Sequence, residues 1–319
     1  MHRSGTSLVT RSLQVLGAQL GEDMARPNWA NPTGYWEDTS VHALNVDALA
    51  AIGTTWDSLA PITDSDLDRL IDLGFLAAAT SLLSGKLDEA DIVAVKNPRM
   101  LRLKPFWDRA LTEMGGAVDA VLTVRHPLSV ARSLERRNAM PVRQSYLLWM
   151  THVLAAAQMS VGRRHVVVAY DRMIQSPEQE FDRIARTLEL SVDTDERAQF
   201  LSSILDPELR HTEFTDEQLR EDAECPEIVQ EMYSHLVGVA SASRTLDQQL
   251  VEDWATEVDR LTPTLRHIDS LNLALSRARQ PFSLRRSLYH TARAAIRWMP
   301  FLRALPTSLK ARIARMLRC

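Results

Sequence analysis

Met1-His2-Arg3-Ser4-Gly5-Thr6-Ser7 opens the chain and runs directly into a pattern of leucine and valine at helical spacing. A short glycine-bearing loop at a helix N-terminus is a ready anion site, because the first N–H groups of a helix have no internal partners. Gly5 lets the backbone approach an oxyanion closely, and Arg3 can hold its oxygens in a planar fork. The stretch therefore predicts a phosphate-type loop before a helix over about residues 6–20. The alternative is a disordered terminus with a Ser/Thr helix cap.

The loop lacks the Gly-Lys-Ser/Thr ending of ATP-binding loops, since Thr6 follows Gly5 directly. It resembles the 5′-phosphosulfate-binding loop of sulfotransferases, in which Lys/Arg-Ser-Gly-Thr-Thr/Ser closes on the 5′ end of 3′-phosphoadenylyl sulfate (PAPS). The variant His-Arg-Ser-Gly-Thr-Ser resembles a bacterial branch of that family. The resemblance implies that the donor is bound by Arg3, Ser4, Gly5, Thr6 and Ser7, and that Arg3 also takes part in catalysis.

A second motif lies in the middle of the chain, after the apolar run 121–124, which predicts a buried strand. Arg125-His126-Pro127 then turns into a helix, with Pro127 near the first helical position. Ligands of open α/β sheets gather beyond the carboxyl ends of strands, where Arg125 is expected. Arg125 and Ser133 resemble the family's 3′-phosphate-binding element, Arg-x-Pro followed by a helical Ser. The resemblance implies that these two residues bind the 3′-phosphate that distinguishes PAPS from ATP.

Two further segments supply candidates for the chemistry. Residues 31–38 form an irregular loop in which two aromatic residues precede Glu37 and Asp38. The apolar run 92–95 predicts a strand and ends in Lys96-Asn97-Pro98-Arg99, which resembles the Lys-Asp/Ser-Pro element of sulfotransferases. The resemblance implies that Glu37 is the general base and that Lys96 stabilises the departing phosphate, with Asp38 and His126 as weaker candidates for the base. The alternatives are a surface turn in which Asp38 caps a helix over 40–51, and solvated cations after the strand.

The order of predicted elements indicates the architecture. Apolar runs at 92–95, 121–124 and 166–170, separated by helices, predict an α/β fold with a three-layer α/β/α parallel sheet of the P-loop-like sulfotransferase type. The strand that should precede the first loop is missing, so we expect an upstream start, a truncated chain or another segment in its slot. The predicted units are a nucleotide-binding domain over 1–240 and a helical C-terminal extension over 241–319. Helical spacing predicts further helices over 64–84 (capped by Asp64), 142–161, 177–190, 216–237 and 245–279.

Charge is distributed unevenly along the chain. Residues 270–319 carry eleven of the 37 Lys and Arg and no acidic residue, which leaves 26 cations against 41 acidic residues in the remainder. The basic, apolar-faced helices predicted over 282–298 and 307–318 are typical of contact with an anionic membrane surface. The alternative is a tail docked on the acidic body or on a partner.

Other features bound the compartment and the cofactors. The two cysteines, Cys225 and Cys319, give no disulfide framework and indicate a reducing compartment. No run approaches the ~20 apolar residues of a membrane span, and no secretory signal pattern is recognisable. The nine histidines show no metal-ligand spacing. We expect a cytoplasmic protein without a metal, in peripheral contact with the membrane through residues 282–318.

Together these features predict a sulfotransferase that moves a sulfuryl group from PAPS to a hydroxyl or amine of a small-molecule or glycan acceptor, and that binds no nucleic acid. Trp29, Tyr35 and Trp36 can stack on a sugar ring, which favours a glycan or glycolipid. One alternative is an ATP-dependent P-loop kinase, which requires a Gly-Lys-Ser/Thr loop and a magnesium-holding Asp. The other is a non-catalytic interaction protein that retains a degenerate core of this type.

Overall fold

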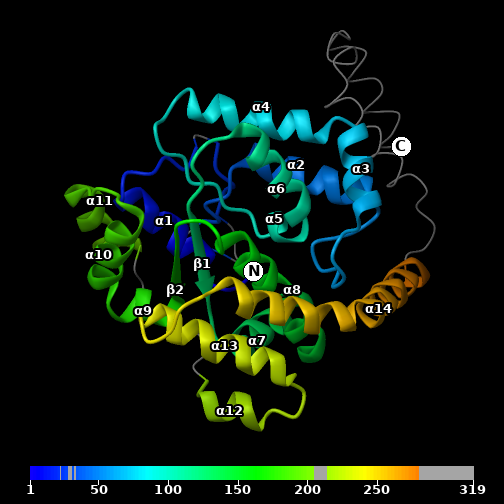
Figure 1. Cartoon of the computed structure of the whole chain (residues 1–319). Helices are drawn as coiled ribbons and strands as arrows, with labels where there is room; N and C mark the ends of the chain where they lie inside the picture. The colour runs from blue at the N-terminus through cyan, green and yellow to red at the C-terminus, as the bar shows by residue number, and fades with distance from the viewer. Residues whose placement is uncertain (22, 28–30, 32–33, 205–213, 280–319) are drawn as a thin grey trace.

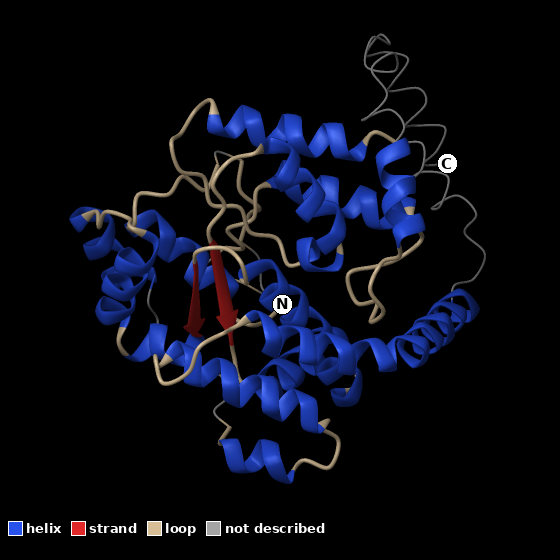
Figure 2. Ribbon diagram, in the orientation of Figure 1, coloured by secondary structure: helices blue, strands red, loops and turns tan. Residues whose placement is uncertain are grey.

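A computed structural model describes residues 1–21, 23–27, 31, 34–204 and 214–279. Most of these residues are helical, and a small parallel sheet lies among the helices (Figures 1 and 2). The helices predicted over 282–298 and 307–318 lie outside the described residues. Within the described ranges no single helix is long and apolar enough to cross a membrane, although the pair 64–72 and 75–87, bent by 71°, passes that test by length and composition.

The sheet consists of β1 (Ala120–Val124) and β2 (His165–Ala169), paired in parallel from Ala120 opposite His165 to Val124 opposite Ala169. Alternate residues of a strand point to opposite faces, and helices cover both faces here. Val167 joins a core cluster with α7 (Pro127–Asn138), α8 (Val142–Ser160) and α13 (Glu227–Ala240). Val168 joins another with α1 (Thr6–Val15) and α10 (Pro177–Leu188). The apolar run 121–124 and residues 166–169 of the second run thus form doubly covered strands, as predicted, whereas Tyr170 already belongs to the helix that follows.

A third cluster is helical, and it fills the space between α2 (Thr39–Ala51), α4 (Phe75–Leu87) and α6 (Lys104–Met114). The last described helix, α14 (Gln248–Arg279), buries Val251 and Trp254 in the cluster that contains Val167, so it packs onto the body of the molecule. The remaining elements are α3 (Asp64–Asp72), α5 (Arg99–Arg102), α9 (Tyr170–Gln175), α11 (Thr194–Gln199), the π-helical turn η1 (Phe200–Ile204) and α12 (Asp216–Glu221).

The sheet is smaller than predicted. The prediction of a strand over 92–95 is wrong, because this extended segment makes only a single parallel bridge, between Gln19 and Val93. The Gln19 N–H donates to the Ile92 carbonyl at 2.9 Å, and the Gln19 carbonyl accepts from the Ala94 N–H at 2.8 Å. With no further rungs the bridge does not extend into a ladder, and β2 is the only strand paired with β1 in the described part of the chain.

Glycine and proline divide or shorten several predicted helices. Helix α1 ends at Val15 rather than near residue 20, since Gly17 takes a left-handed φ of 78°. Gly74, with φ 80°, separates α3 from α4, and Pro226 precedes α13 and separates it from α12. The cap of α3 is Thr63 and not Asp64, because the Thr63 hydroxyl accepts the Asp66 N–H at 3.1 Å. The helices predicted over 142–161, 177–190 and 245–279 are confirmed as α8, α10 and α14.

Candidate functional site

The opening loop and the segment after β1 contact each other directly, although they lie far apart in the sequence. Arg3 Nε donates to Ser133 Oγ at 2.8 Å, and Arg125 Nη1 donates to the Arg3 carbonyl oxygen at 3.0 Å. Ser133 lies on α7, which starts at Pro127 because proline needs no hydrogen-bond acceptor in the first turn. The two segments predicted to bind opposite ends of one donor are therefore neighbours in space.

Tyr170, the first residue after β2, packs against both segments. The Arg125 guanidinium carbon lies 4.3 Å from the centroid of the Tyr170 ring, in a cation–π contact. The same ring covers Gly5, where an added Cβ would lie only 2.0 Å from Cδ2 of Tyr170. Glycine is thus required at position 5 because the Tyr170 ring lies against it. The sequence instead predicted that Gly5 lets the backbone come close to a bound oxyanion. Tyr170 itself packs at the end of a strand, as its position in the sequence indicates.

The loop combines backbone strain with the burial of polar and charged groups. Arg3 has a left-handed φ of 63°, which is costly for a residue with a side chain. The Ser4 hydroxyl is buried and has no hydrogen-bond partner among the described residues. Burial lowers the pKa of Arg3 and that of Arg125; Tyr170 opposes both shifts, and neighbouring arginine charges add to them. A bound anion would offset the cost of burying these cations and supply an acceptor for the hydroxyl.

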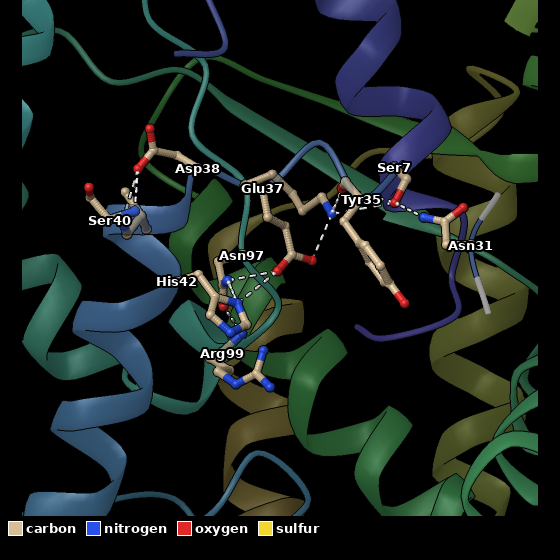
Figure 3. Close-up of polar contacts among 11 residues, drawn as sticks. Ser7, Asn31, Tyr35, Glu37, Asp38, Ser40, His42, Asn97 and Arg99 are labelled. Atoms are coloured by element: carbon tan, nitrogen blue, oxygen red, sulfur yellow. Dashed lines mark hydrogen bonds and ion pairs between the residues drawn. The ribbon is translucent and has the colours of Figure 1, made fainter. Parts of the chain in front are cut away.

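Glu37 is the centre of a second polar group, at the end of the loop that precedes α2 (Figure 3). Lys96 Nζ donates to Glu37 Oε1 at 2.9 Å, and Asn97 Nδ2 donates to Oε2 at 2.9 Å. His42 Nδ1 lies 3.3 Å from the same Oε2. The carboxylate is almost completely buried but has partners from three directions, which is how a buried charge is tolerated.

Ser7 connects this group to the opening loop. Its hydroxyl donates to the Tyr35 carbonyl oxygen at 3.1 Å and accepts from Asn31 Nδ2 at 3.2 Å. Lys96 Nζ lies 3.5 Å from Ser7 Oγ and also donates to the Tyr35 carbonyl. Trp36 has a left-handed φ of 51°, so the backbone is strained directly before Glu37. Residues from four segments of the chain thus form one continuous polar site.

The environment of the Glu37–Lys96 pair favours the ionised carboxylate. Burial on its own raises the pKa of Glu37, but hydrogen bonds from His42 and Lys96 and the Lys96 charge outweigh it, so the net shift is downward. Burial lowers the pKa of Lys96, although the Glu37 charge and hydrogen bond oppose that shift. Glu37 is therefore a deprotonated group that can accept a proton, with a cation held at its side.

Two weaker candidates for the base are placed elsewhere. Asp38 caps α2, accepting from the Ser40 and Val41 N–H groups at 2.9 and 3.0 Å, and pairs with Lys86 at 2.5 Å. This is the structural alternative that the sequence left open. His126 is buried with its Nε2 3.3 Å from the Thr215 carbonyl and its ring against that of Tyr233. In the described part of the chain, neither side chain forms a hydrogen bond or an ion pair with Glu37 or Lys96.

The other predicted residues differ in how closely they join the site. Thr6 starts α1, directly after Gly5, and Arg99 starts α5, two residues after Asn97. Trp29 lies outside the described residues. Sequence reasoning missed His42, and it gave Asn97 no role beyond its place in the Lys96–Arg99 segment. The one available signal for His42 is its place in the first turn of a helix that begins two residues after Glu37.

The described residues contain no group of three or more His, Cys, Asp or Glu side chains placed to hold a metal ion. No protein-family model matches the sequence. Comparison with curated proteins and with solved structures likewise gives no match. The functional argument therefore depends on the chemistry and geometry of the residues described above.

Proposed function

We propose that this protein is a sulfotransferase that uses PAPS as donor. The observation that carries the proposal is the direct contact of Arg3 with both Ser133 and Arg125. The opening loop carries the element predicted to bind the 5′-phosphosulfate, and the segment after β1 carries the element predicted to bind the 3′-phosphate. A single nucleotide can bind to both elements only if they are adjacent. Arg3, Arg125 and the unpartnered Ser4 hydroxyl present donors suited to phosphate and sulfate oxygens.

A P-loop-like three-layer fold belongs to the same proposal. It is supported by the helices on both faces of β1 and β2 and by the parallel bridge between Gln19 and Val93. In such folds anions bind beyond the carboxyl ends of the strands, where Arg125 and Tyr170 follow β1 and β2.

The Glu37 group supplies the chemistry expected of the acceptor side. The acceptor hydroxyl oxygen forms a bond to the donor sulfur while the bond from sulfur to the phosphate oxygen breaks, and the bisphosphate (PAP) leaves with that electron pair. Glu37, which is ionised, accepts the hydroxyl proton. Lys96 and Arg3 stabilise the charge that develops on the departing phosphate, as in other in-line transfers.

Thermal-shift titration tests the donor assignment. A ligand that binds only the native state at 100 times its Kd adds about 2.7 kcal/mol, which for a chain of this size raises Tm by roughly 5 °C. We expect this rise with PAP and a much smaller one with AMP or ATP. Equal responses to all three nucleotides, or none, would contradict the proposal.

The variant Arg125→Ala should lose the preference for PAP over AMP, because the 3′-phosphate then lacks its predicted cation. Arg132→Ala is the matched control, since Arg132 lies on α7 and is exposed in an ion pair with Glu135 at 3.0 Å. PAP selectivity that survives in Arg125→Ala would refute the assignment of this residue.

A further inference from the structure

Two arginines next to the Glu37 group have no part in the proposed donor site. Arg99 begins α5, and its N–H donates to Asn97 Oδ1 at 3.0 Å, on the amide that holds Glu37 (Figure 3). Arg137 comes from the C-terminal part of α7, and its guanidinium carbon lies 5.6 Å from the centroid of the Trp56 ring. The His2 ring packs edge-on against the same indole at 4.7 Å between centroids.

The pKa of each guanidinium group reflects both burial and nearby charge. Burial lowers the pKa of Arg137, and the charges of Arg3 and Arg99 lower it further, while Tyr35 and Glu37 oppose that shift. Burial also lowers the pKa of Arg99, and the negative charges of Glu37 and Asp57 oppose that shift. Burial is the main cause that holds the pKa of His2 well below its usual range, and the charges of Arg99 and Arg137 lower it further. The imidazole is therefore neutral and adds no positive charge.

Within the described chain neither guanidinium forms an ion pair. Arg137 Nε has the Asn138 amide oxygen as its partner, at 2.6 Å. Three other partly or fully buried arginines form ion pairs with carboxylates, Arg11 with Glu196, Arg163 with Asp108 and Arg183 with Glu180, whereas Arg102 donates to backbone carbonyls. The Glu37 charge acts on both guanidinium groups but forms no ion pair with either of them; its oxygens contact Lys96, Asn97 and His42 instead. Two partly buried cations that lack a direct ion-pair partner are costly to keep, and an anionic ligand lowers that cost.

We propose that Arg99, Arg137 and Trp56 form an acceptor subsite that selects an anionic sugar, one bearing a phosphate, sulfate or carboxylate in addition to the hydroxyl that is modified. The partly exposed indole adds apolar surface beside the guanidinium groups, which bind the anion in their planar forks. This inference rests on the proposed function, since it takes Glu37 as the group that faces the reacting hydroxyl. The inference goes beyond the proposed function by specifying that the acceptor is negatively charged, a property that the donor site does not determine.

The test measures binding to the full chain with PAP present at saturation, so that the donor site is filled. Calorimetric titrations compare glucose 6-phosphate and glucuronate with glucose. We expect each anionic sugar to bind at least tenfold more tightly than glucose, and the preference to weaken as salt is raised. Arg99→Gln and Arg137→Gln should each reduce that preference about tenfold, whereas Arg132→Gln, the exposed ion-paired control on α7, should leave it unchanged.

The outcomes separate the two proposals. If PAP binds but the three sugars bind equally, or if both site variants behave like Arg132→Gln, the acceptor subsite is refuted and the donor assignment stands. If PAP fails to bind while the anionic sugars still depend on Arg99 and Arg137, the anion subsite stands and the sulfotransferase proposal falls. Retention of PAP affinity in Arg99→Gln and Arg137→Gln shows that these variants remain folded.

Discussion

Replacement of Gly5 by alanine should destabilise the fold through a clash that can be measured separately from backbone strain. An added Cβ would lie 2.0, 2.5 and 2.9 Å from Cδ2, Cε2 and Cγ of Tyr170, far inside normal contact distance. The ring cannot easily move aside, because Arg125 packs on it at 4.3 Å. In addition, the φ of 79° is a left-handed conformation that alanine adopts at a cost.

These two effects set the magnitude. The left-handed conformation costs roughly 1–2 kcal/mol, and overpacking a filled site costs about 1–3 kcal/mol, so Gly5→Ala should lower the free energy of unfolding by about 2–5 kcal/mol. Gly53→Ala is the matched control: Gly53 has a φ of 71°, but nothing lies within 4 Å of an added Cβ. It should therefore cost only the roughly 1–2 kcal/mol of backbone strain.

Urea denaturation without ligand provides the measurement, with m-values compared to verify that the unfolding transition is the same. Tyr170→Ala removes the ring, so Gly5→Ala in that background should cost no more than Gly53→Ala does. The reasoning is refuted if Gly5→Ala and Gly53→Ala destabilise equally, or if the cost of Gly5→Ala is the same with and without the Tyr170 ring.

Two other predictions concern the site and its frame. The pKa of Glu37 is lowered in the folded state, so its contribution to stability is present above its unfolded pKa of about 4.3 and is lost as the pH falls below it. Lys96→Met should weaken that loss, because the Lys96 charge and hydrogen bond both lower the pKa of Glu37, and should cost on the order of 3 kcal/mol at pH 7; identical stability–pH curves for the two proteins would contradict this. Asp38→Ala removes the cap of α2 and should lower the free energy of unfolding by about 1 kcal/mol at pH 7, measured by urea denaturation, with a change within error counting against the cap.

Local chemistry made part of the fold predictable. Proline at the start of α7, the Asp38 cap of α2 and the apolar runs of β1 and β2 are each specified by a few neighbouring residues. The predicted strand over 92–95 failed because pairing is not a local property: its residues suit a strand, but the only pairing it makes is the bridge to Gln19. Gly74 was overlooked because its flanking residues keep helical spacing on both sides of the break.

The candidate site shows the same division. Arg3, Arg125 and Ser133 carry recognisable motifs, and the sequence could nominate Glu37 and Lys96 from their neighbours. Their mutual contacts arise from packing between distant segments, which no local pattern encodes. The contact of Arg137 with Trp56 belongs to this second kind, since neither residue lies in a motif and 80 positions separate them.

The ring of Tyr170, wedged between Gly5 and Arg125, ties the opening loop to the end of β2. Because the sheet is buried on both faces, this wedge gives the loop the rigidity of the core rather than that of a free chain end. An incoming oxyanion would therefore meet donors that are already preorganised, and binding would sacrifice little conformational entropy of the loop.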